Sequence, residues 1–343
     1  QKKPELETMT KKITHLALAL VTLLTGCSMI PTYERPAAPV PTGFPNVAAS
    51  ESPATLPSWR TYFAEPRLQQ LIELALNNNR DLRIASLNVE QARAQFQVRR
   101  AAQYPAVGLA ANASRAPASG TGNITNNFSV GLAVTAWELD FFGRVASLKE
   151  QALAQYLATE EGRNAAQVSL ISSVANGWLN LLADEELLEL SRRTLATREE
   201  SVRLTKLRLD SGAASELDYR QAESLAQAAR TTLAQQQRQR ALDENALALL
   251  LGQPLPEDIR ATLGRSDLNA APVIQAVPAG LPSDLLVQRP DIRQAEQQLI
   301  AANANIGAAR AAFFPRISLT AQAGTSSGEL SGLFKNGSWG FTL

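Results

Sequence analysis

The sequence predicts a mainly α-helical protein built from two related units, each of which passes from a helix into a β-hairpin. Residues 81–113 and 291–323 align without a gap and are identical at 12 of 33 positions. Each segment contains a proline at the same place, where the apolar pattern changes from helical to alternating. The chain also has no proline between Pro117 and Pro254, which allows helices much longer than those of a compact domain.

The N-terminal part of the chain predicts export from the cytoplasm. We interpret residues 1–8 as extraneous upstream residues, because Met9 opens a short cationic segment. Residues 9–26 then have the form of a signal peptide. The apolar run from Ile13 to Leu24 has the length of a signal core and is too short to span a membrane comfortably.

A lone cysteine ends this segment. Leu24, Thr25 and Gly26 precede Cys27, and this arrangement resembles the bacterial lipobox, so we expect cleavage before Cys27 and its modification by acyl chains such as palmitate. Ser28 stands where an aspartate would signal retention in the inner membrane, which favours the outer membrane. The alternative is an ordinary signal peptide with an incidental cysteine.

The composition excludes several kinds of site. His15 and Cys27 are the only histidine and the only cysteine, which excludes most zinc and copper sites, nucleophilic triads and disulfides from the rest of the chain. The net charge of +1 implies no strongly acidic or basic partner. Asp184, Glu185 and Glu186 are consecutive, so on a helix they point in different directions and are expected to be solvated surface. We expect no enzyme, no cofactor and no metal.

A tether and the helices of the first unit follow the cysteine. Residues 27–58 contain seven prolines, which predicts an extended tether carrying the lipid. Residues 59–104 and 291–314 are predicted as the helices of the two units. Because a proline forces the preceding residue out of the helical region, Pro105 and Pro315 are predicted as helix-to-strand joints.

Each joint is predicted to lead into a β-hairpin. Residues 105–140 form the first, with its second strand over Phe128–Trp137, and residues 315–343 form the second, with a loop over Gly324–Ser338. The long segment that follows the first hairpin has no counterpart after Leu343. We therefore expect this chain to be a C-terminally truncated form.

The segment 141–252 is predicted as a hairpin of two long antiparallel helices, Arg144–Asp210 and Glu216–Leu251. Ser215 is a plausible N-cap for the second helix, and residues 253–290 form a connector to the second unit. Apolar residues recur at a spacing of seven along the first helix, which predicts a narrow coiled-coil seam. The seam residues are Val174, Leu181, Leu188, Leu195, Val202 and Leu209.

These elements predict a place in the cell envelope. Two strands per unit give four in a complete chain, too few to close a membrane barrel alone, although several chains could close one together. Aromatic residues near the strand ends (Phe128, Trp137 and Trp339) favour an outer membrane. The long helices are too polar for lipid and are therefore expected in the periplasm.

Four motifs carry a resemblance to a known family: LTGC at 24–27, WELDFFGR at 137–144, QRPDIR at 288–293 and GAARAAFFPRISL at 307–319. The chain resembles the outer-membrane factor family of TolC-like channels, and within it the OprM-type lipoproteins of multidrug efflux pumps. This resemblance implies a homotrimer with a 12-stranded β-barrel, continued by a helical barrel across the periplasm and joined through a periplasmic adaptor to an inner-membrane resistance-nodulation-division transporter.

The resemblance also assigns a role to the turn between the long helices. Gly212, Ser215, Leu217 and Asp218 match the family's Gly-x-x-Ser-x-x-Asp type of turn, which implies a docking site for the adaptor. The alternative is a turn that only connects two helices.

The function implied by the resemblance is a passive exit duct for drugs or solvents. One alternative within the same fold is a duct for metal ions or for proteins secreted by a type I system. Methionine beyond Met9 and Met29 is absent, which leaves no metal-selective lining. The sequence is also compatible with a periplasmic scaffold lipoprotein without a pore and with a non-functional fragment.

Overall fold

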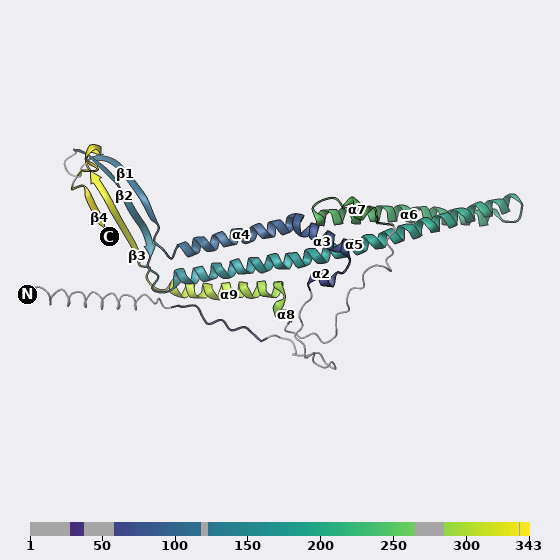
Figure 1. Ribbon diagram of the computed structural model, residues 1–343, viewed down its shortest axis with the longest axis horizontal. Helices are drawn as coiled ribbons and strands as arrows, with labels where there is room; N and C mark the ends of the chain where they lie inside the picture. The colour runs from purple at the N-terminus through teal and green to yellow at the C-terminus, as the bar shows by residue number, and fades with distance from the viewer. Residues whose placement is uncertain (1–27, 38–57, 118–122, 265–284, 336) are drawn as a thin grey trace, which may run out of the picture. The chain divides into compact units, whose positions relative to one another are not determined.

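The computed structural model describes residues 28–37, 58–117, 123–264, 285–335 and 337–343 (Figure 1). The described residues fall into two compact units. The first takes its residues from 1–37, 89–160 and 293–343, and the second from 38–88 and 161–292. The predicted fold class, long helices combined with antiparallel strands, is confirmed.

A four-stranded antiparallel sheet occupies the first unit, with its strands in the order β1-β2-β3-β4. The strands are β1 (Val107–Pro117), β2 (Ile124–Glu138), β3 (Ser318–Ser327) and β4 (Trp339–Thr342). Strand β2 thus begins before Phe128, and β3 continues into the segment predicted as a loop from Gly324. That part of the loop prediction is wrong, because Gly324 pairs with Gly131 inside the sheet.

The β2 and β3 backbones approach each other unusually closely at this glycine pair. A Cβ added to Gly131 would lie 2.4 Å from the Ala323 carbonyl oxygen, and one added to Gly324 would lie 2.3 Å from the Val130 carbonyl oxygen. Glycine within a strand is typical of such close approaches and of bends in a sheet. The pairing register also shifts between Val134 and Trp137, which marks a bulge in the same strand.

The two helix-to-strand joints have the same backbone geometry. Helix α4 spans Arg80–Ala101, and helix α9 spans Pro290–Ala311. Each helix ends three residues earlier than the sequence predicted. A tighter turn, with a hydrogen bond between residues three apart, follows each helix. The Tyr104 N–H donates to the Ala101 carbonyl at 3.0 Å, and the Phe314 N–H donates to the Ala311 carbonyl at 3.1 Å. The resemblance between the two repeats in sequence is therefore a resemblance in structure as well.

Residues 28–37 lie against α9 within the first unit. The Asn303 amide donates to the Pro31 carbonyl oxygen at 2.7 Å, and Arg35 is bound by Glu296 with its Nε 2.6 Å from Oε1. Ile30 packs against the backbone of Gly307, where a side chain would not fit: a Cβ on Gly307 would lie 2.7 Å from Ile30 Cγ1. This end of the predicted tether therefore has fixed contacts.

The second unit contains the hydrophobic core cluster, which includes the largest buried side chains. Its shorter helices are α2 (Trp59–Tyr62), α3 (Pro66–Asn78), α7 (Glu257–Arg260) and α8 (Leu285–Gln288). They accompany α6 (Glu216–Leu251) and residues 161–210 of α5 (Arg144–Asp210). Both long helices have the predicted bounds, and α5, with 67 residues, is about 100 Å long at 1.5 Å per residue. The largest fully buried side chains are Trp178, Leu68, Leu71, Ile72, Leu181, Leu247, Leu251 and Ile259.

The predicted seam faces inward along α5, but its burial is graded. Val174, Leu181 and Leu188 are at most 3% exposed, whereas Leu195, Val202 and Leu209 are only half-buried. Among the helices that the structure describes, none is both long and apolar enough to cross a membrane. Several predictions lie outside the described residues, namely Leu24, Thr25, Gly26, Cys27, the segments 1–8 and 9–26, and parts of 27–58 and 253–290.

Candidate functional site

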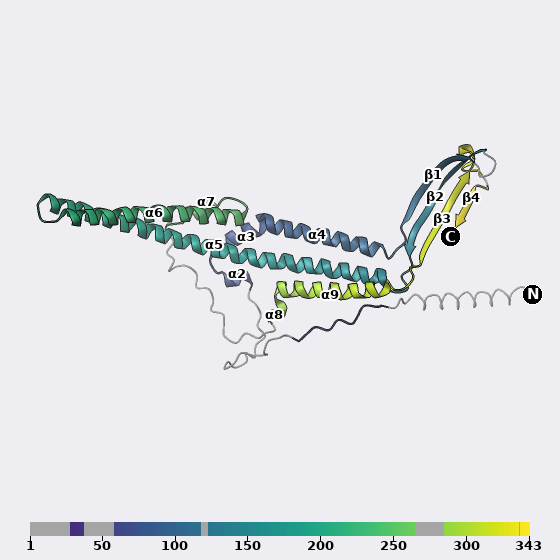
Figure 2. The same cartoon turned by 180° about the vertical axis from the view of Figure 1, so that it is seen from behind.

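A short turn joins the end of α5 to the start of α6 (Figure 2), and backbone hydrogen bonds close it at the end of α5. The Gly212 N–H donates to the Leu209 carbonyl at 2.9 Å, and the Ala213 N–H donates to the Arg208 carbonyl at 2.7 Å. Gly212 has φ +75°, in the left-handed region. These two bonds and this conformation are those of a Schellman motif, which satisfies the last carbonyls of a helix.

A capping box begins α6 on the other side of the turn. The Asp218 N–H donates to Ser215 Oγ at 3.1 Å, and the Ser215 N–H donates to Asp218 Oδ2 at 2.9 Å. The predicted N-cap at Ser215 is thus confirmed, with Asp218 as its reciprocal partner. Hydrogen bonds from Ser215 hold the pKa of Asp218 below its ordinary value, because they stabilise the ionised carboxylate.

Leu217 has no part in this capping. Its side chain is 65% exposed, and it lies between two residues whose side chains are bonded: Glu216 is 2.9 Å from Arg220 Nε, and Asp218 caps the helix. Of the four residues predicted for the turn, three therefore define its backbone. Leu217 is the one that presents an apolar side chain to solvent.

A shallow groove of about 330 Å³ runs between the two helices next to the turn. Tyr219 lies on one side, with Lys206 Nζ 5.4 Å and Arg220 Cζ 5.3 Å from the centre of its ring. Farther from the turn, the groove is lined by an ion pair in which Arg230 Nη2 lies 2.8 Å from Glu199 Oε1. The turn and this groove form one surface of mixed charged and aromatic character.

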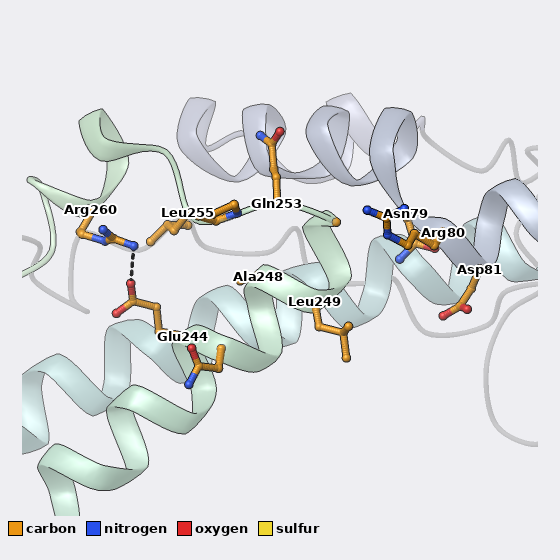
Figure 3. Close-up of a pocket in the computed structure, with 12 residues that line it drawn as sticks. Asn79, Arg80, Asp81, Glu244, Ala248, Leu249, Gln253, Leu255 and Arg260 are labelled. Atoms are coloured by element: carbon orange, nitrogen blue, oxygen red, sulfur yellow. Dashed lines mark ion pairs between the residues drawn. The ribbon is translucent and has the colours of Figure 1, made fainter.

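An open cleft of about 550 Å³ lies elsewhere in the second unit (Figure 3). Arg260 Nη2 and Glu244 Oε1 are 2.8 Å apart across it, and Asn79 and Asp81 line its other end. Sequence patterns did not single it out, because residues 79–81 and 244–260 are distant in the chain and meet only through tertiary contacts such as the 2.9 Å hydrogen bond from the Asn79 amide to the Leu250 carbonyl. In the described part of the chain, no three acidic, cysteine or histidine side chains could jointly hold a metal ion.

One prediction about surface residues is wrong. Asp184 was expected to be solvated, but it is only 7% exposed, because α6 covers that face of α5. Burial and the neighbouring carboxylate of Asp243 raise the pKa of Asp184 to about 6. The sequence did contain a signal for this burial: Asp184 lies three residues after Leu181 and four before Leu188, on the face of the seam.

Asp184's two neighbours differ from it. Glu185 is half-buried and accepts a hydrogen bond of 2.5 Å from Arg240 Nε. Glu186 is exposed, as predicted.

Comparisons with known proteins agree with this architecture. A sequence profile described as "Outer membrane efflux protein" matches residues 71–253 and 281–343. The chain is 46% identical to the probable efflux pump outer membrane protein TtgC of Pseudomonas putida, over 96% of this chain and 69% of that protein. It is 44% identical to the outer membrane protein OprJ of Pseudomonas aeruginosa, over 95% of this chain and 69% of that protein.

Solved structures are similar over almost the whole chain. The open state of the Neisseria gonorrhoeae MtrE outer membrane channel has a TM-score of 0.80 and 42% identity, over 92% of this chain and 71% of that one. A membrane protein from Pseudomonas aeruginosa has a TM-score of 0.82 and 43% identity, over 92% and 72%. The chain therefore belongs to the outer membrane efflux protein family and has the fold of its TolC-like channels.

Proposed function

We propose that this protein is the outer-membrane exit duct of a tripartite pump that expels antibiotics and organic solvents. The observation that carries the proposal is the pair of equivalent joints, at which α4 and α9, neither of them long and apolar enough to cross a membrane, continue into strands of one sheet. Relatives named for antibiotic, toluene and solvent efflux support the choice of cargo. A duct of this kind needs no cofactor and catalyses no reaction.

We propose further that three copies assemble. Within the described residues, β1 and β4 are the outer strands of a four-stranded sheet, and outer strands present unpaired backbone groups to another chain. Three such sheets supply the 12 strands expected of the barrel. Small-angle scattering of the detergent-solubilised protein would give a trimer's mass, and a monomer would contradict the assembly.

The surface that meets the periplasmic adaptor is proposed to be the turn at Gly212, Ser215, Leu217 and Asp218. Leu217 supplies the binding contact, because it is exposed and not used in the cap. Changing Leu217 to Ser should abolish cross-linking to the adaptor and drug resistance while the amount of protein in the outer membrane stays the same. Leu225→Ser, at a 51% exposed position on the same helix, is the matched control and should retain both.

The membrane anchor is proposed to be Cys27, processed after Leu24, Thr25 and Gly26. Mass spectrometry of the N-terminal peptide should show an acylated cysteine as its first residue. Cys27→Ser should remove the acyl mass. An unmodified Cys27 in the mature protein would refute the anchor and leave the remaining proposals standing.

The pump assignment is tested by resistance. Expression of the protein should raise resistance to antibiotics and solvents only in a strain that also makes the adaptor and the proton-driven inner-membrane transporter. Resistance without these two components would contradict a passive duct. Absence of conductance in a planar bilayer would favour a scaffold without a pore.

A further inference from the structure

Asp184 is a buried acid that forms no ion pair among the residues that the structure describes, although the positive charge of Arg240 acts on it. It is 7% exposed, and its Oδ2 atom has no hydrogen-bond partner within the part of the chain that the structure describes. Burying an ionised carboxylate without a donor is costly, so such a group is paired, protonated or bound to a ligand. The core residues Leu181 and Leu188 flank it on the same face of α5.

The register of the two helices places Asp243 opposite Asp184. Glu199 on α5 pairs with Arg230 on α6, and Glu185 pairs with Arg240. Because the helices are antiparallel, each residue back along α5 corresponds to one residue forward along α6, and these two ion pairs place the position that faces Asp184 between 241 and 245. Asp243 occupies that position, and it is half-buried.

The surrounding charges do not neutralise this pair. Arg240 is engaged by Glu185 at 2.5 Å and by Glu244 at 2.6 Å. The α7 residue Arg260 is engaged by the same Glu244 at 2.8 Å. The neutral side chain of Gln239 donates to Asp243 Oδ2 at 3.0 Å, which leaves Asp184 facing a carboxylate.

A proton fits this arrangement better than a metal ion does. Divalent calcium and magnesium need six or more oxygen ligands, and no suitable group of three acidic side chains occurs among the described residues. One proton can be shared by two facing carboxyl groups, which converts their repulsion into a hydrogen bond.

We propose that Asp184 and Asp243 form a proton-operated clasp between α5 and α6. In acid, one proton bridges the two carboxylates and holds the helices together at this level. At neutral pH the proton leaves, and two like charges face each other inside the hairpin.

The direction of the effect follows from the titration of Asp184. Its pKa is about 6 in the closed hairpin, against the ordinary value of 3.8, so the closed state binds the proton more tightly than an opened one. Stabilisation by the clasp is therefore full below pH 3.8 and is lost as the pH rises through about 6. Between about pH 5 and about pH 7.5, these two pKa values give on the order of a tenfold change in the opening equilibrium.

Amide hydrogen exchange of the full-length chain in detergent tests the clasp. After correction for the intrinsic exchange rate, segments 180–188 and 239–247 should be about tenfold more protected at about pH 5 than at about pH 7.5. Asp184→Asn and Asp243→Asn each replace one charge by an amide that can donate to the remaining carboxylate. Both variants should be well protected at both pH values.

The matched control is Glu189→Gln, which removes a half-exposed carboxylate from the same helix and should keep the wild-type pH dependence. Infrared spectra should show a protonated carboxyl band at about pH 5 that Asp184→Asn removes.

Three results would overturn the proposal. One is a wild-type hairpin whose protection does not change with pH. Another is a pH dependence that survives in both asparagine variants. The third is recovery of protection at neutral pH on adding Na⁺ or Ca²⁺, which would assign the site to a cation.

Discussion

Two glycines in the second unit have almost the same backbone conformation but very different surroundings. Gly212 has φ +75° and Gly252 has φ +71°. A Cβ on Gly212 would meet nothing within 4 Å, whereas a Cβ on Gly252 would lie 2.4 Å from the Asn78 carbonyl oxygen. Changing each glycine to alanine therefore separates the cost of the left-handed conformation from the cost of a steric clash.

The magnitudes follow from these surroundings. Both substitutions force an L-residue into the left-handed region, which costs about 1 kcal/mol of unfolding free energy. Gly252→Ala also pushes the end of α3 away from α6, and overpacking of this kind costs a further 1–3 kcal/mol, roughly. Gly177→Ala should instead stabilise by about 0.5–1 kcal/mol, because a helical alanine is favoured and its Cβ would lie at an ordinary 3.4 Å from Leu247 Cδ1.

The assay is thermal loss of helicity, followed by circular dichroism at constant detergent concentration. The midpoint should rise for Gly177→Ala, fall slightly for Gly212→Ala and fall most for Gly252→Ala. Equal destabilisation at Gly212 and Gly252 would refute the reasoning, because the clash with Asn78 would then have no energetic weight.

Three further predictions concern the core, the sheet and the turn. Trp178→Phe removes the indole N–H that donates to Glu65 Oε2 at 2.9 Å. Thermal unfolding should show a free energy of unfolding lower by about 1–3 kcal/mol, and an unchanged midpoint would contradict this role. Gly131→Val should disrupt β2–β3 pairing, seen as loss of strand signal in infrared spectra, whereas a normal sheet would show that the close approach can relax. Because the pKa of Asp218 is lowered, its capping contribution is present at neutral pH and is lost as the pH falls below the ordinary aspartate value. Amide exchange at the turn should therefore speed up in acid, after intrinsic correction, but not in Ser215→Ala.

Much of the fold is visible in the sequence because its signals are local. The two prolines mark the joints, the alternation after them marks β1 and β3, and the long proline-free segment allows the length of α5 and α6. The cap at Ser215 is equally local, since a capping box needs only a serine and an acid three residues later. These features do not depend on which distant segment packs against them.

The failures concern residues whose environment is set by distant parts of the chain. Gly324 was expected to begin a loop, because its pairing with Gly131 depends on a strand almost two hundred residues away. Asp184 was expected to be solvated, because a run of acids suggests surface until α6 is laid over it. The cleft between Asn79 and Arg260 is likewise created by tertiary packing alone.

The graded burial of the seam has a consequence for motion. Near Val174 and Leu181, opening α5 from α6 exposes fully buried apolar side chains, whereas at Val202 and Leu209 much of that surface is already in water. Local opening therefore costs progressively less free energy toward the turn. The outer end of the hairpin can fray and reclose while its middle stays paired, so thermal fluctuations are concentrated at the turn that we propose as the docking surface.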